Sequence, residues 1–502
     1  MIKANFKVTA DVVIGKIDPR MWGSLTEQLG RSVYNGIYQP NHPLADKNGF
    51  RRDVIDAVKK LKIPLVRYPG GNFVSGYNWE DGIGPKSKRP IRLDLAWKSI
   101  EPNQFGLHEF LTWCKTINAQ ADMAINLGTR GIDAARNLVE YCNFPAGTYW
   151  SNLRIKNGQK NPFNVKLWSL GNEMDGEWQI GHKTAYEYGR LAHETAKAMR
   201  IIDPSIELIA CGSSLHSMPS FGSWEEEILD NVYDDVEYLS LHQYYDDNDH
   251  DIKKFLSSSI DLDSFINEVI SICDAVKARK HQTKTMYLAM DEWNVWYHSK
   301  ESDTKQKPWQ QAPNLLEDHY TFADALVVGS LALTLIKHAD RIKIGCLAQL
   351  INVIAPIVTN NEGTPTIWYQ SIFYPFMQVA NYAQGTALKV NSKVADYTVS
   401  NRVVPYVSSS AVYNQSKCEV VLFIENKAAE EVDFDYKLAD FPQVTLKEAT
   451  QFAGYDLDET NEKQTMQIEN LKDINVNNQN CVNGKIAPYS WNMIRLSAIS
   501  HG

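Results

Sequence analysis

From Met21 to about Ala380, short apolar segments alternate with longer stretches in which apolar residues recur every three or four positions. The first pattern is typical of buried β-strands, and the second of amphipathic helices that cover them. In the stretch 262–276, for example, apolar residues are spaced 3, 4, 3 and 4 positions apart. Repetition of a strand and a helix predicts βα units. The eight candidate strands are residues 21–25, 65–69, 121–128, 165–170, 206–212, 236–241, 286–290 and 344–350.

The number and character of these segments favour an α/β fold in which the strands close into a parallel (β/α)8 barrel, the TIM-barrel architecture. The strands are almost continuously apolar, as parallel strands covered on both faces must be. A doubly wound open sheet would give a similar pattern. Chemically useful side chains follow several of the strands, however, and barrel enzymes place their active sites at that end. We therefore assign residues 19–380 to a catalytic barrel.

Outside the barrel, short segments with alternating apolar and polar residues predict antiparallel strands. From about Thr386 such segments are separated by turns rich in Asn, Gly and charged residues, which predicts a C-terminal antiparallel β-sandwich over residues 381–502. Residues 4–17 alternate in the same way before the first barrel strand. We therefore expect residues 1–18 to contribute one or more strands to the same sandwich.

Composition and charge narrow the possible partners and location. The net charge is −9 and there is no dense block of Lys and Arg, which argues against a nucleic-acid or anionic-membrane partner. The first residues lack the apolar core of a signal peptide, and the most apolar stretch, 325–336, is only long enough for a buried helix. The seven cysteines are scattered without a CxxC spacing. These features predict a cytoplasmic protein with reduced thiols.

Two glutamates follow apolar strands in a pattern that predicts glycosidase chemistry. Glu173 lies in LWSLGNEMDG after the fourth strand, and Glu292 lies in MYLAMDEWNVWY after the seventh. Either one alone would be interpreted as a solvated residue or as a charge at a helix start. Because the C-terminal ends of all barrel strands meet at one face, we expect the two carboxylates to face each other. Glycoside hydrolysis needs such a pair, one protonated to assist the leaving group and one ionised to attack the anomeric carbon.

Other polar residues lie at or beyond the same strand ends, so we expect them in the same cleft. Asn172 is placed to donate a hydrogen bond to the substrate 2-hydroxyl, a contact that strengthens in the transition state. His242 and Tyr244 are two positions apart and could both point to the cleft, although a single histidine at a strand end is more often structural. The remaining polar candidates are Glu27, Asn72 and Gln349. The aromatic residues that could stack on sugars are Trp97, Trp178, Trp296 and Tyr297.

Arg67 lies within the second strand, where an unpaired buried charge would be costly, so a carboxylate partner is expected. Glu292 is the natural candidate, because the arginine would help to keep the nucleophile ionised. A structural ion pair elsewhere is the alternative.

No motif indicates a cofactor or a metal. Gly70 and Gly71 lack the GxGxxG spacing of a dinucleotide site, and they more simply permit a tight backbone path. The acidic run at residues 246–251 lacks the glycine and the terminal glutamate of a calcium loop and has no zinc-type spacing. We interpret it as a solvated loop.

Several segments also carry a more specific resemblance. They are GSLTEQLGRSVYNGIY (23–38), VRYPGGNFVSGYNWEDGIGP (66–85), RPIRLDLAW (89–97), WSLGNEMDG (168–176), LHQYY (241–245), DEWNVWY (291–297), CLAQLINVIAPI (346–357) and APYSWNMIRL (487–496). Over nearly the whole chain they resemble the α-L-arabinofuranosidases of glycoside hydrolase family 51, a family of retaining barrel glycosidases. The resemblance implies a barrel with a C-terminal β-sandwich, a retaining mechanism, no cofactor and a homo-oligomer, commonly a hexamer.

Matched motif by motif, the resemblance implies that Glu173 is the general acid/base and Glu292 the nucleophile. It also places His242 near the catalytic centre. The residues that it assigns to the arabinofuranose hydroxyls are Glu27, Asn72, Asn172, Tyr244 and Gln349. One position departs from the common form EHLGR, since this chain has Gln28 where that form has His. This substitution affects the expected fine specificity or subgroup, but it does not affect the role assigned to Glu27.

These observations together predict a retaining, exo-acting α-L-arabinofuranosidase. Its substrates would be arabino- and arabinoxylo-oligosaccharides, from which it would release terminal non-reducing arabinofuranosyl residues. Another retaining barrel glycosidase, such as a β-xylosidase or an endo-β-glucanase, is an alternative because many specificities share the two-glutamate barrel. A catalytically inactive carbohydrate-binding protein is a second alternative. The sequence leaves open whether 1,2-, 1,3- or 1,5-linkages are preferred.

Overall fold

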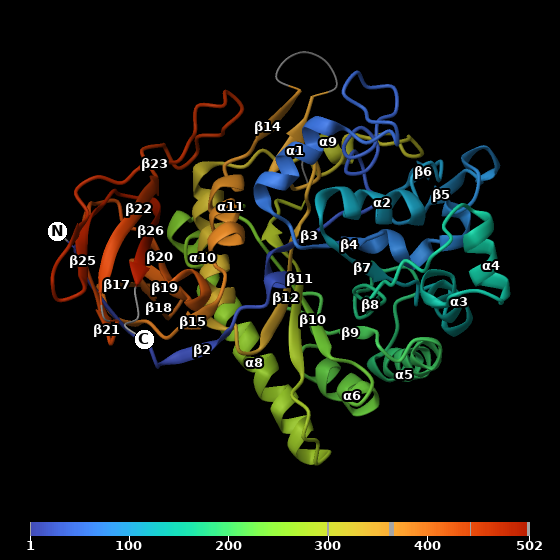
Figure 1. Ribbon diagram of the computed structural model, residues 1–502, viewed down its shortest axis with the longest axis horizontal. Helices are drawn as coiled ribbons and strands as arrows, with labels where there is room; N and C mark the ends of the chain where they lie inside the picture. Colours follow the sequence, from blue (N-terminus) through green and yellow to red (C-terminus); the bar gives the residue numbers. More distant parts are fainter. Residues whose placement is uncertain (1, 299–300, 361–365, 442, 499–502) are drawn as a thin grey trace.

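The eight predicted strands form a closed barrel in the computed structural model, which describes residues 2–298, 301–360, 366–441 and 443–498. Neighbouring strands pair in parallel in the order β10-β11-β12-β3-β4-β7-β8-β9. The strands are β3 (Gly23–Leu25), β4 (Leu65–Tyr68), β7 (Gln120–Ala124), β8 (Leu167–Leu170), β9 (Glu207–Cys211), β10 (Tyr238–Tyr245), β11 (Tyr287–Val295) and β12 (Ile342–Ala348). Each predicted segment overlaps one of them, so the (β/α)8 barrel is confirmed (Figure 1).

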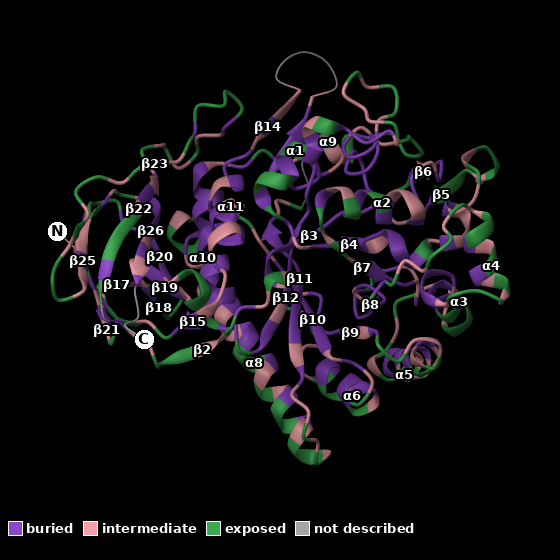
Figure 2. Ribbon diagram, viewed as in Figure 1, coloured by how far each residue is buried: buried purple, intermediate pink, exposed green. Residues whose placement is uncertain are grey.

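Helices lie between the strands and cover the outside of the barrel. They are α1 (Arg52–Leu61), α2 (Leu107–Ile117), α3 (Ile132–Asn143), α4 (Tyr149–Lys156), α5 (Ala185–Ile202), α6 (Ser223–Val232), α7 (Ile252–Phe255), α8 (Ser258–Arg279), α9 (Glu301–Thr304), α10 (Phe322–Lys337) and α11 (Phe373–Tyr382). The predicted apolar stripe 262–276 falls in α8, but Cys273 is buried there and Ile272 is only half-buried. Figure 2 shows buried strands at the centre and exposed positions on the outer sides of the helices.

Two barrel strands are longer than their apolar runs indicated. The predicted segments stop at residues 241 and 290, because polar side chains begin there. Pairing continues, however, to Tyr245 on β10 and Val295 on β11, after a register irregularity between Ser240 and His242. His242 and Glu292 are therefore direct partners within the sheet, and not residues just beyond it as the sequence pattern predicted. The barrel interior at this end is polar, which is why the apolar signal ended early.

Most of the remaining strands form a sandwich of two sheets, and three further pairs of short strands, β5-β6, β13-β14 and β17-β18, form separate two-stranded sheets. One sheet has the order β16-β1-β21-β25-β24 and the other β2-β15-β19-β20-β26-β22-β23. Their bounds are β1 (Ile2–Thr9), β2 (Val13–Lys16), β15 (Thr386–Leu388), β16 (Asn391–Lys393), β19 (Val407–Asn414), β20 (Glu419–Asn426), β21 (Val432–Ala439), β22 (Val444–Phe452), β23 (Glu469–Asn470), β24 (Asn475–Val476), β25 (Cys481–Ile486) and β26 (Ser490–Ala498). The predicted C-terminal sandwich is thus confirmed, and both N-terminal strands pair within it. One detail differs, since β1 pairs with β21 in parallel.

The barrel and the sandwich meet along α10. This helix carries the apolar stretch 325–336, and every residue from Phe322 to Ile336 is buried, as expected for a core helix. It packs against α8 and α11 on the barrel side and against β19, β20 and β26 on the sandwich side (Figure 1). Successive residues of β20 point in opposite directions and pack into two different hydrophobic cores. Leu422 belongs to the core between the two sheets, whereas Phe423 belongs to the core shared with the barrel.

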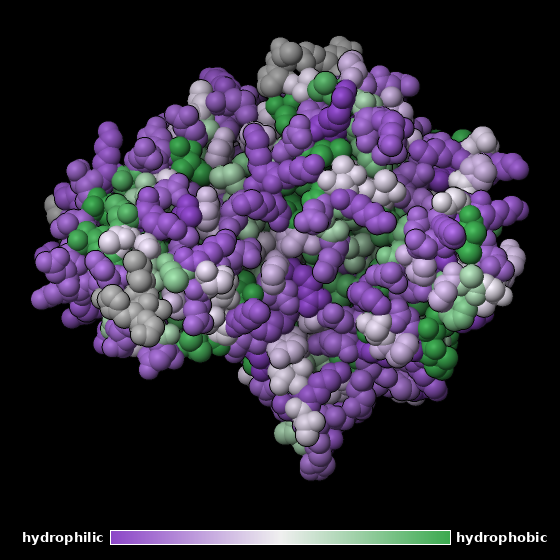
Figure 3. Space-filling view, in the orientation of Figure 1, coloured by the Kyte–Doolittle hydropathy of each residue, from purple (hydrophilic) through white to green (hydrophobic). Residues whose placement is uncertain are grey.

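Among the described residues no helix is both long and apolar enough to cross a bilayer. The face shown in Figure 3 is mainly hydrophilic, with hydrophobic residues scattered over it. All seven cysteines have free thiols, and five of them are buried.

Candidate active site

The C-terminal ends of the barrel strands enclose a pocket of about 350 Å3. Its walls come from residues that follow β3, β4, β8 and β12 and from residues on or after β10 and β11, because parallel strands all end at the same face. The lining residues are Glu27, Leu29, Gly71, Asn72, Trp97, Glu173, Tyr244, Glu292, Trp296, Leu316, Gln349 and Ile354. Most residues singled out from the sequence are therefore brought together here. Arg67, Asn172 and His242 lie directly behind this wall and contact the residues that form it.

Three apolar lining residues, Leu29, Leu316 and Ile354, were not expected from the sequence. An apolar residue near a strand end has the same local pattern as a core residue, so nothing in the sequence distinguishes it. Leu316 and Ile354 have φ angles of 52° and 37°, a backbone region that bulky residues rarely adopt. The backbone amide of Ile354 donates to the carbonyl of Leu316 at 2.7 Å, which links the two at the pocket wall.

Glu292 is held by two hydrogen-bond donors, one on each carboxylate oxygen. Arg67 Nη1 donates to Glu292 Oε1 at 2.8 Å, and the Tyr244 hydroxyl donates to Oε2 at 2.7 Å. Arg67 is fully buried, and its other groups contact Asn172 Oδ1 at 2.9 Å and Asp291 Oδ2 at 3.3 Å. These carboxylates compensate the buried guanidinium and raise its pKa against the effect of burial. Glu292 is the partner that the sequence suggested for Arg67.

Glu173 has a different environment. Its Oε1 contacts His242 Nδ1 at 3.0 Å, and its Oε2 accepts a hydrogen bond from Trp178 Nε1 at 2.7 Å. Burial raises the pKa of Glu173 above its usual value, and the negative charge of Glu292 acts in the same direction, although the hydrogen bonds from His242 and Trp178 oppose it. The residue also has a φ of 44°, so the backbone turns sharply where its side chain enters the pocket. A raised pKa is what a general acid needs near neutral pH.

His242 lies between the acidic side chains. Its Nδ1 is 3.0 Å from Glu173 Oε1 and 3.5 Å from Glu292 Oε2, and its Nε2 is 3.5 Å from Asp291 Oδ1. Burial alone would lower the pKa of the imidazole, but the charge of Glu292 and the contacts with Asp291 and Glu173 raise it to about 10. The ring is therefore protonated at neutral pH, and its Nδ1 donates to Glu173 Oε1. His242 thus contacts three acidic side chains, whereas a purely structural histidine at a strand end would be isolated from such groups.

One oxygen of Glu173 and one of Glu292 lie within 4.8 Å of each other. Retaining glycosidases have carboxyl groups roughly 5 to 5.5 Å apart, whereas inverting enzymes need roughly 6.5 to 9.5 Å to admit a water molecule between carboxylate and sugar. The nearest oxygens of Glu173 and Glu292 are therefore close enough for the shorter of these two separations.

Glu27 is buried at the side of the pocket. It accepts hydrogen bonds from the Phe73 amide at 2.8 Å and from Trp97 Nε1 at 2.9 Å, and its own amide donates to Gln349 Oε1 at 3.0 Å. Burial raises the pKa of Glu27 to about 8. Its carboxylate lies against Gly71, where a Cβ atom would come within 2.1 Å of Oε2 and the φ is 21°. The double glycine thus permits the close approach of backbone and carboxylate.

The aromatic candidates separate into three groups. Trp97 and Trp296 line the pocket, and Trp178 contacts Glu173 at its edge. Tyr297 does not line the pocket, because its hydroxyl donates to Asp324 at 2.7 Å on the α10 side. Gln28, at the position that departs from the common family form, also lies outside the lining. Its amide donates to the Tyr68 hydroxyl and the Phe105 carbonyl.

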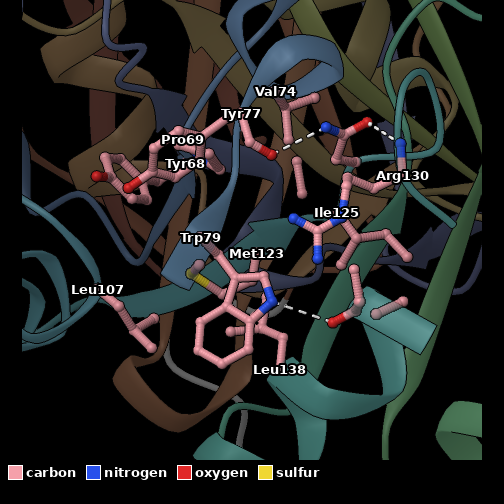
Figure 4. A pocket seen from close by; sticks show the side chains of 14 residues that line it. Tyr68, Pro69, Val74, Tyr77, Trp79, Leu107, Met123, Ile125, Arg130 and Leu138 are labelled. Carbon is pink, nitrogen blue, oxygen red and sulfur yellow. Dashed lines mark hydrogen bonds between the residues drawn. The ribbon is translucent and has the colours of Figure 1, made fainter. Parts of the chain in front are cut away.

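A second cavity of about 480 Å3 lies beside β4 and β7 (Figure 4). Its walls are mainly apolar and include no pair of carboxylates. Trp79 Nε1 donates to the Ala134 carbonyl at 3.1 Å, and Asn126 Nδ2 donates to the Tyr77 carbonyl at 2.9 Å, so its polar groups are satisfied internally. We therefore place the chemistry in the pocket at the barrel mouth.

Within the described residues, one group of side chains brings three potential metal-ligand atoms within 4.8 Å of one another, and it is Glu173, His242 and Glu292. A protonated imidazole offers no lone pair to a cation, and Arg67 already compensates Glu292. This donor set suits proton transfer better than metal binding. The acidic run 246–251 is a mostly exposed loop after β10.

Two carboxylates that face each other at the C-terminal face of a (β/α)8 barrel are the arrangement of a glycoside hydrolase. Family models named α-L-arabinofuranosidase 1 domain and α-L-arabinofuranosidase C-terminal domain match residues 57–259 and 291–490. The chain therefore belongs to the α-L-arabinofuranosidases of glycoside hydrolase family 51, which confirms the resemblance.

Individual relatives agree with this assignment. The chain is 50% identical over 498 residues, 99% of both chains, to an intracellular exo-α-(1→5)-L-arabinofuranosidase of Bacillus subtilis. It is 57% identical over 432 residues to an enzyme of the same name from Acetivibrio thermocellus, covering 85% of this chain and 86% of the relative. A solved family 51 α-L-arabinofuranosidase from Bifidobacterium longum has a TM-score of 0.94 at 39% identity, covering 99% of both chains.

Proposed function

We propose that this protein is an exo-acting, retaining α-L-arabinofuranosidase that releases terminal non-reducing arabinofuranosyl residues from arabino- and arabinoxylo-oligosaccharides. The observation that carries the proposal is the close pair Glu173 and Glu292, whose oxygens lie within 4.8 Å in a pocket at the barrel mouth. Relatives named for α-(1→5)-linkages support 1,5-linked arabino-oligosaccharides as the first substrates to test, although one 47% identical relative is named for α-(1→6)-linkages.

The reaction proceeds in two displacements. Glu292 attacks the anomeric carbon while Glu173 gives its proton to the glycosidic oxygen, so the C–O bond breaks and a β-linked arabinofuranosyl-enzyme forms. Glu173, now ionised, then takes a proton from a water molecule that attacks the same carbon and releases Glu292. Two inversions leave the α-configuration unchanged. Arg67 and Tyr244 stabilise the charge of Glu292 before the first step and after the second.

The sugar is held by polar residues around this pair. In our proposal its hydroxyls contact Glu27, Asn72, Asn172, Tyr244 and Gln349, with Trp296 as an apolar wall. These side chains form a connected network before substrate binds. Asn172 Nδ2, for example, donates to Asn72 Oδ1 at 3.2 Å, and Gln349 Nε2 is 3.4 Å from Glu27 Oε2. Such preorganisation reduces the cost of orienting the site when the sugar enters.

The decisive experiment is hydrolysis of an aryl α-L-arabinofuranoside followed by NMR. We expect α-arabinofuranose as the first product and loss of turnover in Glu173→Ala with an unactivated oligosaccharide. Aryl β-xyloside and β-glucan serve as the comparison substrates, because they represent the other barrel glycosidases. Faster hydrolysis of either, or a β-configured first product, would overturn the proposal.

We further propose a cytoplasmic homo-oligomer, commonly a hexamer in this family, with no nucleic-acid or membrane partner. The net charge of −9 and the relatives named as intracellular support this setting. Ile91, Leu93 and Leu95 expose large apolar side chains, and a subunit contact would cover them. Light scattering of the purified protein measures the oligomeric state directly, and a monomer would contradict it.

A further inference from the structure

Trp178 makes a contact that the two-glutamate mechanism does not by itself require. Its indole Nε1 donates to Glu173 Oε2 at 2.7 Å, although 49% of the tryptophan is exposed. Glu173 Oε1 is held separately by His242 Nδ1 at 3.0 Å. Both oxygens of the proton-transferring carboxylate are therefore engaged before a substrate arrives.

The two donors determine which oxygen can carry the catalytic proton. Because His242 is protonated at neutral pH, its Nδ1–H donates to Oε1 of Glu173 and occupies that position. The transferable proton then belongs on Oε2, the oxygen that Trp178 contacts. An indole N–H can donate but cannot accept a hydrogen bond. It therefore stabilises Oε2 most strongly when that oxygen has lost its proton.

The chain from Glu173 to Gln179 holds the indole ring in this place. The ring lies against Gly176, where a Cβ atom would come within 2.5 Å of it. Two successive turns shape the segment, since the Gly176 amide donates to the Glu173 carbonyl and the Gln179 amide to the Gly176 carbonyl, both at 3.0 Å. The buried Gln179 side chain donates to Ser75 Oγ and anchors the far end. The segment is thus fixed at both ends of the tryptophan.

We propose that Trp178 is a positioning residue for Glu173: it orients the proton-carrying oxygen and stabilises the carboxylate in the states where its proton has been given away. In the first displacement the proton leaves Oε2 for the glycosidic oxygen, and in the second a proton from water returns to Oε2. The hydrogen bond from Trp178 strengthens as negative charge appears on this oxygen and weakens as the proton returns. This inference rests on the proposed function and adds a residue that tunes its acid/base.

The test is the pH dependence of kcat/KM for an aryl α-L-arabinofuranoside. Trp178→Phe removes the N–H and keeps an aromatic ring, so the ionised form of Glu173 loses a hydrogen-bond donor and the pKa of Glu173 rises. The alkaline limb of the kcat/KM profile should therefore move to higher pH by about 0.5 to 1 pH unit. The charged and titratable groups that face Glu173, which are His242, Glu292 and Tyr244, remain in place. Gly176→Ala should shift the limb in the same direction, because it displaces the ring without removing a polar group.

Two controls separate this role from general damage. Trp296→Phe removes an indole whose Nε1 has no hydrogen-bond partner in the described part of the chain, so KM should change while the alkaline limb stays in place. In a Glu173→Ala background, Trp178→Phe should leave the pH profile of an activated substrate unchanged, because no acid remains to be tuned.

An unmoved limb in folded, active Trp178→Phe and Gly176→Ala variants would overturn the inference, and so would a shift that persists without Glu173. Failure of the proposed function looks different, since the unaltered protein would then not hydrolyse the arabinofuranoside at all.

Discussion

At the scale of single residues, two glutamates acquire different roles from their neighbours. Glu292 receives donors on both oxygens, one of them a buried guanidinium. Glu173 is buried beside that negative charge, which raises its pKa. When two neighbouring carboxyl groups have surroundings as different as these, the difference is the usual basis for assigning one as the acid and the other as the nucleophile.

Chemical rescue with azide tests this assignment. In Glu173→Ala, a substrate with a good leaving group still forms the glycosyl-enzyme, which accumulates because no base activates water. Azide needs no base, so it should restore turnover and yield the α-arabinofuranosyl azide. In Glu292→Ala, azide can occupy the space of the lost carboxylate and displace the leaving group directly, which yields the β-azide. NMR identifies the anomer of each product, and the opposite pairing of variants and products would exchange the two roles.

The pH dependence gives a second prediction. Since Glu173 must be protonated for the first step and its pKa is raised, kcat/KM should persist to higher pH than an ordinary glutamate would allow, and should fall as pH rises through that value. With an activated leaving group, Glu173→Ala should lose this alkaline limb of kcat/KM. Initial rates over a series of buffers measure both profiles. An alkaline limb unchanged in the variant would show that another group titrates.

At the scale of elements, the sequence predicted which segments are strands and which are helices. It did not predict the lengths of β10 and β11 or the parallel pairing of β1 with β21. Periodicity of apolar residues reports burial, so the eight strands and the fully buried α10 were predictable. β10 and β11 extend beyond their apolar runs because the barrel interior at that end is lined by polar catalytic side chains. The parallel pairing of β1 with β21 depends on a partner more than 400 residues away, which no local pattern encodes.

The contact between α10 and the sandwich predicts a stability effect. Trp491 on β26 is fully buried against α10, donates to Gln378 Oε1 at 2.7 Å and stacks with Phe423. Trp491→Ala should lower the free energy of unfolding by about 3 to 5 kcal/mol through the cavity that it leaves. Denaturant unfolding measures the change. Val403→Ala, at a position 62% exposed, is the control and should cost no more than about 0.5 kcal/mol. Equal effects of the two variants would contradict the interface role.

At the scale of the whole molecule, the two carboxylates proposed for catalysis lie in a pocket at the barrel mouth. The pocket of about 350 Å3 is bounded by both polar and apolar side chains, including Leu29, Leu316 and Ile354. A pocket admits the end of a chain, whereas a groove is needed to bind its middle. This shape is consistent with exo-action on terminal sugars.

The shape leads to a prediction about substrate size. Short arabino-oligosaccharides should be hydrolysed faster than polymeric arabinan or arabinoxylan at equal concentrations of terminal arabinose, because a long or branched chain must still place one terminal sugar in the pocket. Arabinose release over time, measured for a matched series of chain lengths, checks this. Comparable rates of arabinose release from polymer and trisaccharide would contradict this prediction.

The sequence by itself determined the barrel, the sandwich and the two carboxylates that we propose for catalysis, because burial periodicity is local and parallel strands bring their C-terminal ends to one face. The tertiary structure decided which donor each carboxylate oxygen receives. It set Arg67 on Glu292, a pairing that the sequence had only suggested, placed Trp178 and His242 on Glu173, and brought apolar residues such as Ile354 into the pocket wall. These contacts join residues from different strands and loops, and their geometry depends on strand register and on backbone angles such as the φ of 44° at Glu173. Residue order along the chain does not specify such angles, and they arise only when the barrel closes.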